Sequence, residues 1–205
     1  MENSVRFLFS GDSALVIEFG DEISVDINKK IRKMMDDIKK ENIDGIVELV
    51  PTYCSLLINY DVLKIDYNTL VEKLKTFLNN DLETAEGEEV TLVEIPTLYN
   101  DEVGPDLYYV AEHNKLSKEE VIKIHTGTDY LVYMLGFMPG FTYLGGMSEK
   151  IATPRLESPR LQIYPGSVGI AGKQTGMYPS MSPGGWRIIG RTPLKLYNPD
   201  SDTHV

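Results

Sequence analysis

Apolar positions in the first half of the chain alternate between strand-like and helix-like patterns. Apolar residues recur at helical spacing from 27 to 38, after Ser24, and again from 70 to 77, which predicts two amphipathic helices, the first of them capped by Ser24. Four runs rich in β-branched and aromatic residues predict strands; they cover residues 14–19, 43–50, 53–60 and 89–96. This β-α-β-β-α-β order predicts a ferredoxin-like α/β sandwich in residues 1–95.

The pattern changes after Pro96. Pro105-Asp106 predicts a short helix through residue 112, and the S-x-x-E capping box at 117–120 predicts a second helix to about residue 125. From residue 130 onward, short apolar runs are interrupted by Pro or Gly every few residues, which favours a β-barrel. We therefore predict an α+β protein whose second domain, a barrel, covers residues 96–205.

The end of the chain bears on whether this barrel closes. Residues 194–197 resemble a strand, and the polar residues 198–205 that follow resemble a turn. We expect the barrel to be truncated at its C-terminus and to lack a closing hairpin.

Composition excludes several classes of protein. The net charge of −11 argues against nucleic-acid binding, and no run approaches the ~20 apolar residues of a membrane helix. The first twenty residues lack a basic segment followed by an apolar run, so we expect no secretory signal. Cys54 is the only cysteine, which rules out an intrachain disulfide and favours a cytoplasmic location. Its apolar neighbours favour packing over a nucleophilic role.

Charge is unevenly distributed along the chain. Residues 1–95 carry 10 basic and 20 acidic side chains, whereas residues 150–195 carry seven basic side chains and one acidic side chain, Glu157. This local reversal indicates either a site for an anion or an acidic partner, or a group of solvated surface charges.

Two turns in the basic segment can expose backbone N–H groups. Gly166-Ser167 and Gly184-Gly185 each follow a proline. Because proline fixes φ and glycine permits φ above zero, such turns can form anion-binding concavities, although they can equally just connect strands. Neither segment fits the phosphate-binding P-loop or the G-x-G-x-x-G dinucleotide motif. A nucleotide site here would be unconventional or shared with another chain.

Polar side chains near these turns could complete such a site. Arg155 and Arg160 each follow a proline in PRLESPR and offer rigid forks for a carboxylate or phosphate, unless they are merely solvated. Because such cations can stabilise negative charge that develops on oxygen, both arginines are also catalytic candidates. Gln174, Thr175 and Tyr178 supply donors and acceptors suited to an amide or carboxylate.

An aromatic side chain and a histidine complete the set of candidates. Trp186 is either a core anchor or a stacking platform. His125 lies at the end of a predicted helix, where the charged form is favoured, so it is either structural or a general acid or base. No Cys/His/carboxylate spacing indicates a metal site, and no G-x-S-x-G elbow indicates a serine hydrolase.

The motifs GFMPGFTYLGG, PRLESPR, YPGSVGIAGKQTGMYP and SPGGWRIIGRTP resemble the family formed by the B subunit of bacterial 5-oxoprolinase. This family is also described as allophanate hydrolase subunit 1, and as KipI, an inhibitor of a sporulation histidine kinase. The resemblance covers nearly the whole chain and implies a small α+β domain followed by a cyclophilin-like β-barrel. The family normally continues past NPD into a further strand. Its motif residues match the following positions: His125, Arg155, Arg160, Gly166, Ser167, Gln174, Tyr178, Gly184, Gly185 and Trp186.

The resemblance implies a subunit, inactive alone, of a complex with sister subunits A and C. That complex hydrolyses 5-oxo-L-proline to L-glutamate with ATP turnover, and the subunit that binds ATP is left open. A KipI-like inhibitor of histidine-kinase autophosphorylation is the alternative, with a sensor histidine kinase as partner. A further alternative is a subunit related to allophanate hydrolase or urea carboxylase. A cyclophilin-like prolyl isomerase has only an analogy of fold in its favour.

Overall fold

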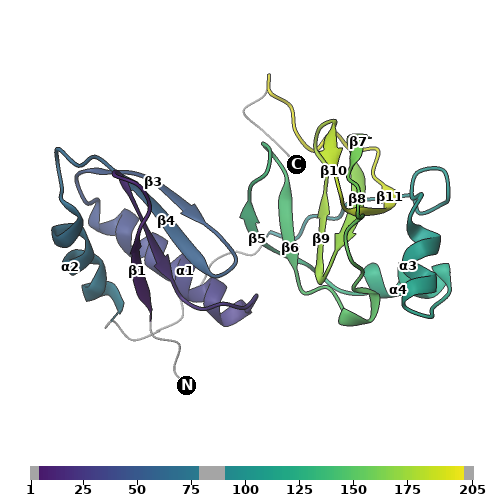
Figure 1. The fold of residues 1–205 in the computed structure, drawn as a ribbon, viewed down its shortest axis with the longest axis horizontal. Helices are drawn as coiled ribbons and strands as arrows, with labels where there is room; N and C mark the ends of the chain where they lie inside the picture. Colours follow the sequence, from purple (N-terminus) through teal and green to yellow (C-terminus); the bar gives the residue numbers. More distant parts are fainter. Residues whose placement is uncertain (1–4, 79–90, 201–205) are drawn as a thin grey trace. The chain divides into compact units, whose positions relative to one another are not determined.

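The computed structural model describes residues 5–78 and 91–200 of the chain. It has a mixed α and β fold whose paired strands are antiparallel, and the chain divides into two compact units, Met1–Val90 and Thr91–Val205 (Figure 1). The first unit thus ends at residue 90, five residues before the predicted limit at 95. Within the described ranges, no helix is both long and apolar enough to cross a bilayer.

The first unit is a four-stranded antiparallel sheet with two helices. In chain order its elements are β1 (Arg6–Phe9), β2 (Ala14–Glu18), α1 (Val25–Glu41), β3 (Ile46–Pro51), β4 (Ser55–Tyr60) and α2 (Tyr67–Leu78). The strands lie in the order β1-β2-β4-β3, and the strands predicted at 43–50 and 53–60 form as β3 and β4, which pair with each other.

The two predicted helices of this unit are confirmed, and their apolar faces form its core. On α1, the side chains at positions 27, 31, 34 and 38 are buried, and on α2 those at 70, 71 and 74 are buried. They pack with Leu15, Ile17, Leu56 and Ile58 of the sheet. Ser24 stands at the N-cap of α1, but its side chain accepts no capping hydrogen bond.

One predicted strand of this unit is wrong. Residues 91–96 form no strand, and residues 89 and 90 lie outside the described part of the chain. Leu92 and Val93 are exposed, so this apolar run lacks a sheet to pack on. The place beside β2 is taken by β1, which sequence analysis missed because only one of its four residues is even half-buried.

The second unit contains short helices followed by short strands. Its elements are α3 (Leu107–His113), α4 (Lys118–His125), β5 (Leu131–Leu135), β6 (Thr142–Gly145), η1 (Glu149–Ile151), β7 (Arg160–Ile163), β8 (Ser167–Ala171), β9 (Gln174–Met177), β10 (Ser182–Gly184) and β11 (Arg187–Arg191). Five strands form a sheet in the order β11-β8-β9-β6-β5, and β10 pairs with β7. The predicted helices and the change to short strands are confirmed.

The capping box at the start of α4 forms as the sequence predicts. The Glu120 backbone N–H donates to Ser117 Oγ at 3.1 Å, and the Ser117 N–H donates to Glu120 Oε2 at 2.7 Å. These two bonds satisfy donors that the first turn of a helix otherwise leaves unpaired.

The five-stranded sheet buries a different core on each face. Successive residues of a strand point to opposite faces, and on β11 Ile189 packs with Leu107 and Val110 of α3, whereas Ile188 packs with Phe141 and Trp186. Figure 1 shows α3 and α4 together beside this sheet. The helices therefore cover one face, and an aromatic cluster covers the other.

The strand predicted at residues 194–197 is wrong, because this segment has no regular structure. Pro193 cannot donate a ladder hydrogen bond, and the Leu194 N–H donates to Thr192 Oγ1 at 3.2 Å instead of to a strand. The chain therefore turns here, although Leu196 is buried.

Candidate functional site

Of the seven cations in the basic segment, three pair with carboxylates within the described part of the chain: Arg160, Lys173 and Arg187. Arg160 forms a bidentate salt bridge with Asp106, in which Nη1 donates to Oδ2 at 2.8 Å and Nη2 donates to Oδ1 at 2.9 Å. Arg187 Nη1 lies 3.7 Å from Asp106 Oδ1, and its guanidinium covers the Tyr109 ring at 3.7 Å from the centroid. The fork of Arg160 is thus occupied by a carboxylate of the protein, and its role toward a ligand remains a prediction.

Asp106 is the central residue of this network, and sequence analysis assigned it only to the start of a helix. Its side chain does not cap α3; instead its Oδ2 accepts the Ile188 N–H at 2.7 Å, and its own N–H donates to the Ile188 carbonyl at 2.9 Å. It is only 5% exposed. Asp106 therefore ties α3, β7 and β11 together. An acid that follows proline indicates a helix start, so nothing in its local sequence pointed to this role.

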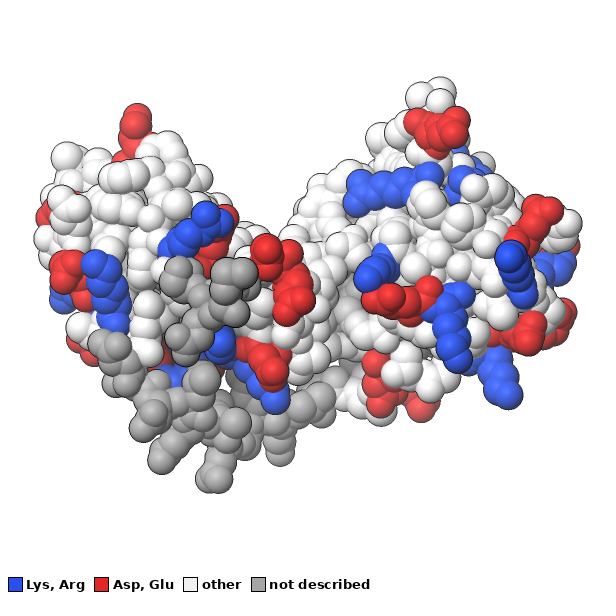
Figure 2. Space-filling model, turned by 60° about the horizontal axis from the view of Figure 1, so that its bottom comes forward, with Lys and Arg blue, Asp and Glu red and all other residues white. Residues whose placement is uncertain are grey.

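Most other cations of the segment are also engaged. Lys173 pairs with Glu149 at 2.6 Å, and Arg191 donates to the Pro165 carbonyl at 2.8 Å. Figure 2 shows basic and acidic side chains interspersed on the face in view. Among the described residues, Arg155 makes no ion pair. It is exposed, and its guanidinium lies 5.9 Å from the centre of the Trp186 ring.

Arg155 lies on the aromatic cluster. The rings of Phe141, Tyr178 and Trp186 meet edge to face, with centroids 5.2 to 6.5 Å apart. Trp186 is buried, which fits a core anchor, and its ring also makes a cation–π contact with Arg155. Burial raises the pKa of Tyr178 to about 12, and nearby Arg155 and Arg160 act against this rise.

Phe137 adds an exposed ring to the cluster from a strained position. Its φ is +64°, and the Met138 N–H donates to the Gly136 carbonyl across it at 2.7 Å, the pattern of a tight three-residue turn. The ring is 59% exposed and meets Phe141 and Tyr178 edge to face. A positive φ on a bulky residue is uncommon and motivates a functional interpretation. The turn presents this ring to solvent beside Tyr178.

The first proline–glycine turn uses its backbone N–H groups internally. The Gly166 N–H donates to the Tyr178 carbonyl at 2.7 Å, and the Ser167 N–H donates to the Tyr164 carbonyl at 3.2 Å. Gly166 has a φ of +79°, and a Cβ there would lie 2.2 Å from the Thr192 carbonyl oxygen. Glycine is therefore required by the close approach of two backbones. The proposed anion-binding role of this turn remains a prediction.

The second turn holds the arginine-bearing loop. Gly184 of β10 pairs with Arg160 of β7, and the Gly185 carbonyl accepts the Leu156 N–H at 2.7 Å. A Cβ on Gly184 would lie 2.5 Å from the Tyr178 hydroxyl. This turn therefore places the PRLESPR loop against the aromatic cluster.

His125 lies away from these groups, in a buried hydrogen-bonded chain. Thr175 Oγ1 donates to the Gly169 carbonyl at 3.0 Å, so toward His125 Nε2, 2.9 Å away, it accepts. Nε2 therefore carries the proton, and Nδ1 accepts from the Tyr99 hydroxyl at 2.9 Å. Burial lowers the pKa of His125 to about 4. The expectation of a charged histidine is wrong because burial outweighs the helix terminus.

The structure divides the predicted site residues between the two faces of the sheet. Those that adjoin the aromatic cluster are Arg155, Arg160, Tyr178, Gly184, Gly185 and Trp186. Thr175 faces His125 on the helix side, and the alternation of β9 places Gln174 on the face of the cluster. Within residues 5–78 and 91–200, no group of three acids, histidines or cysteines is arranged for a metal. The cluster combines an arginine that makes no ion pair within the described residues with an exposed aromatic ring, two groups whose chemistry suits an anion with a flat or apolar body.

Comparison with known proteins places the chain in a family. Residues 5–205 match the family described as carboxyltransferase domain, subdomain C and D. The B subunit of the 5-oxoprolinase of Bacillus subtilis is 47% identical over 201 residues, which cover 94% of this chain and 84% of that protein. Urea amidolyase of Saccharomyces cerevisiae is a distant relative, 24% identical over 89% of this chain and 11% of its own length.

A solved structure supports the same assignment. The crystal structure of TTHA0988 is 31% identical, with a TM-score of 0.79 over 94% of this chain. This chain spans 37% of the TTHA0988 chain. From the match along nearly its whole length and the identity to a curated relative, the chain belongs to the carboxyltransferase subdomain C and D family, and within it to the family of the 5-oxoprolinase B subunit.

Proposed function

We propose that this chain is the B subunit of a 5-oxoprolinase, inactive alone, that works with sister subunits A and C. The complex hydrolyses 5-oxo-L-proline to L-glutamate with ATP turnover. The identity of 47% to the B subunit of a 5-oxoprolinase over most of the chain supports this function. One observation supports a ligand site on this subunit: the exposed guanidinium of Arg155 lies over the Trp186 ring. No carboxylate of the described residues pairs with this guanidinium.

The chemistry of 5-oxoproline suits this arrangement. The substrate is a small planar lactam with one carboxylate, so it needs a cation and an apolar surface. Arg155 supplies the cation without competition from a carboxylate in the described part of the chain, and the exposed ring of Phe137 supplies a face for the lactam. Arg160 also lies near Tyr178, but Asp106 pairs with its guanidinium, so among the described residues the unpaired positive charge at this site is that of Arg155. Positive charge of this kind favours the oxyanion that develops when the lactam opens.

The remaining chemistry belongs to the complex. Opening an unstrained lactam is unfavourable, and phosphoryl transfer from ATP supplies the driving force. His125 has no route to a substrate on the aromatic face, since it lies on the helix side of the sheet. We therefore assign it a structural role in this subunit. The first unit is proposed to be a ferredoxin-like variant whose edge strand comes from the N-terminus, and the second a cyclophilin-like barrel.

The test is reconstitution of the complex. This chain is purified, mixed with subunits A and C, and 5-oxoproline-dependent ADP release is measured with and without it. The proposal predicts that release requires all three proteins. Release that is unchanged when this chain is omitted rejects the proposal. Inhibition of a cognate histidine kinase by the chain, in place of such release, assigns it the inhibitor function instead.

A further inference from the structure

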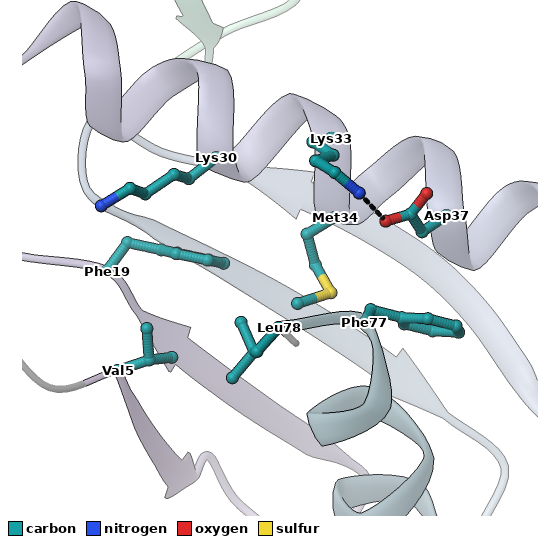
Figure 3. Close-up of a pocket in the computed structure, with 8 residues that line it drawn as sticks. All are labelled: Val5, Phe19, Lys30, Lys33, Met34, Asp37, Phe77 and Leu78. Carbon is teal, nitrogen blue, oxygen red and sulfur yellow. Dashed lines mark hydrogen bonds and ion pairs between the residues drawn. The ribbon is translucent and has the colours of Figure 1, made fainter. Parts of the chain in front are cut away.

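A hollow in the first unit takes no part in the function proposed above. It lies between α1 and the end of α2 and has a volume of about 230 Å³ (Figure 3). The two units are separate compact bodies of the chain, and every residue that lines this hollow belongs to the first. Its chemistry can therefore be considered by itself.

The interior of the hollow is apolar. Phe19 and Met34 are buried at its base, Phe77 is half-buried, and Leu78 is 36% exposed. In Figure 3 the thioether of Met34 points into the space between Phe19 and Phe77. A methionine has a flexible, polarizable side chain that adapts to ligands of different shape. An alkyl or aryl group is the natural content of such a hollow.

Cations stand at its rim. Lys30 and Lys33 are three residues apart on α1 and so lie on one face of the helix. Lys33 Nζ bonds Asp37 Oδ2 at 2.7 Å, whereas Lys30 makes no ion pair within the part of the chain that the structure describes. In Figure 3 the Lys30 ammonium extends toward Phe19. An uncompensated positive charge therefore borders the apolar space.

This charge is notable against the composition of the first unit. Residues 1–95 carry 20 acidic and 10 basic side chains, and six of those ten basic residues lie on α1. Because α1 also carries four acidic residues, its net charge is +2, and this helix is therefore positive within a unit that is acidic overall.

We propose that this hollow binds a small monocarboxylate with a short alkyl or single-ring apolar body. The apolar part lies against Met34 and Phe19, and the carboxylate pairs with Lys30. The volume of about 230 Å³ is below the ~300–1,000 Å³ of drug-sized pockets, so a short apolar body is enough to fill it. Lys33 contributes less because Asp37 already neutralises it.

Octanoate is the probe that tests this site. It is titrated into the full 205-residue chain while amide resonances are followed by ¹H–¹⁵N NMR, with octanol and octylamine as neutral and cationic counterparts. About ten heavy atoms at ~0.3 kcal/mol each correspond to a Kd on the order of several millimolar. We expect saturable shifts confined to α1 and the end of α2, with octanoate bound more tightly than octanol or octylamine.

Two neighbouring lysines provide the matched variants. Lys30→Gln removes the rim cation, and we expect it to weaken octanoate binding about fivefold without changing octanol binding. Lys29→Gln removes a charge that is also exposed and lies one residue away but does not line the hollow, and we expect no change. The proposal is overturned if octanoate produces no saturable shifts, if octanol binds equally well, or if both variants weaken binding alike. None of these outcomes depends on the 5-oxoprolinase activity.

Discussion

Replacing Asp106 by asparagine tests whether the buried carboxylate holds the second unit together. The side chain keeps its shape, but the negative charge between Arg160 and Arg187 is lost, and the asparagine NH₂ group faces guanidinium donors. The carboxylate is 7% exposed and the Arg160 side chain 32% exposed. Removing one partner of a buried ion pair costs about 3–5 kcal/mol, and because water reaches Arg160, we expect about 3 kcal/mol here.

Asp101→Asn is the matched control. Asp101 also pairs with a cation, Lys118, at 2.9 Å, but its side chain is 72% exposed. Exposed pairs contribute about 0.2–1 kcal/mol, so this variant should lose at most a third of what Asp106→Asn loses. The chemical change is the same in both variants, so the contrast measures the buried setting of Asp106 together with its additional arginine and backbone partners.

Urea unfolding followed by tryptophan fluorescence measures both variants. Trp186 is the only tryptophan and lies in the core of the second unit, so its signal reports this unit alone. With a slope of about 2 kcal/mol per molar urea, Asp106→Asn should lower the midpoint by about 1.5 M and Asp101→Asn by less than about 0.5 M. Equal midpoints for Asp106→Asn and the unaltered chain would refute the reasoning.

Three further predictions use the same fluorescence or a helix signal. Burial lowers the pKa of His125 from 6.5 to about 4, so between these pH values the unfolded chain binds one more proton than the folded chain. The free energy of unfolding of the second unit should therefore be unaffected above pH 6.5 and fall by up to about 3 kcal/mol as the pH drops to 4. His125→Gln should flatten this slope, whereas the exposed His113→Gln should not, and parallel slopes for both would contradict it. Gly172→Ala places a Cβ in open space at a φ of +59° and should lower the free energy of unfolding by about 1 kcal/mol. In Gly166→Ala the Cβ also collides with the Thr192 carbonyl, so this variant should lose at least ~2 kcal/mol more. Equal urea midpoints for the two variants would reject the close-approach argument. Ser117→Ala removes a capping hydrogen bond and should lower stability by about 1 kcal/mol, whereas Ser24→Ala loses no capping bond and should change stability little. Thermal unfolding followed by circular dichroism measures both, and a lower melting temperature for Ser24→Ala than for Ser117→Ala would contradict this prediction.

Patterns in the sequence correctly predicted the elements that depend on residues close together along the chain. The helical spacing of Ile27, Ile31, Met34 and Ile38 and the capping box at Ser117 depend on neighbours three or four residues away, and both are confirmed. The run at 91–96 shows the opposite case, because a strand needs a partner that the run itself cannot specify. The exposed, short β1 fills an edge of the sheet because of its pairing with β2, not because of its own pattern.

The candidate site shows the same limit. Arg155, Trp186 and Tyr178 were found from their residue types and from the glycines and prolines around them. Asp106 was missed because its hydrogen-bond partners Arg160 and Ile188 lie 54 and 82 residues away along the chain. The three paired cations of the basic segment looked unpaired because the acids that pair with them, Asp106 and Glu149, lie outside this segment. The net charge of a segment of sequence therefore did not predict the net charge of the folded site.

Arg155→Gln in the reconstituted complex is the most direct test of the ligand site on this subunit. Loss of one charge-assisted contact to the substrate carboxylate, about 1.5–3 kcal/mol, predicts a fall of about 10- to 100-fold in kcat/KM for 5-oxoproline-dependent ADP release. The urea midpoint of the chain should stay unchanged, and Lys173→Gln, which removes a cation paired with Glu149, should keep full activity. A kcat/KM for Arg155→Gln equal to that of the unaltered complex would contradict the account.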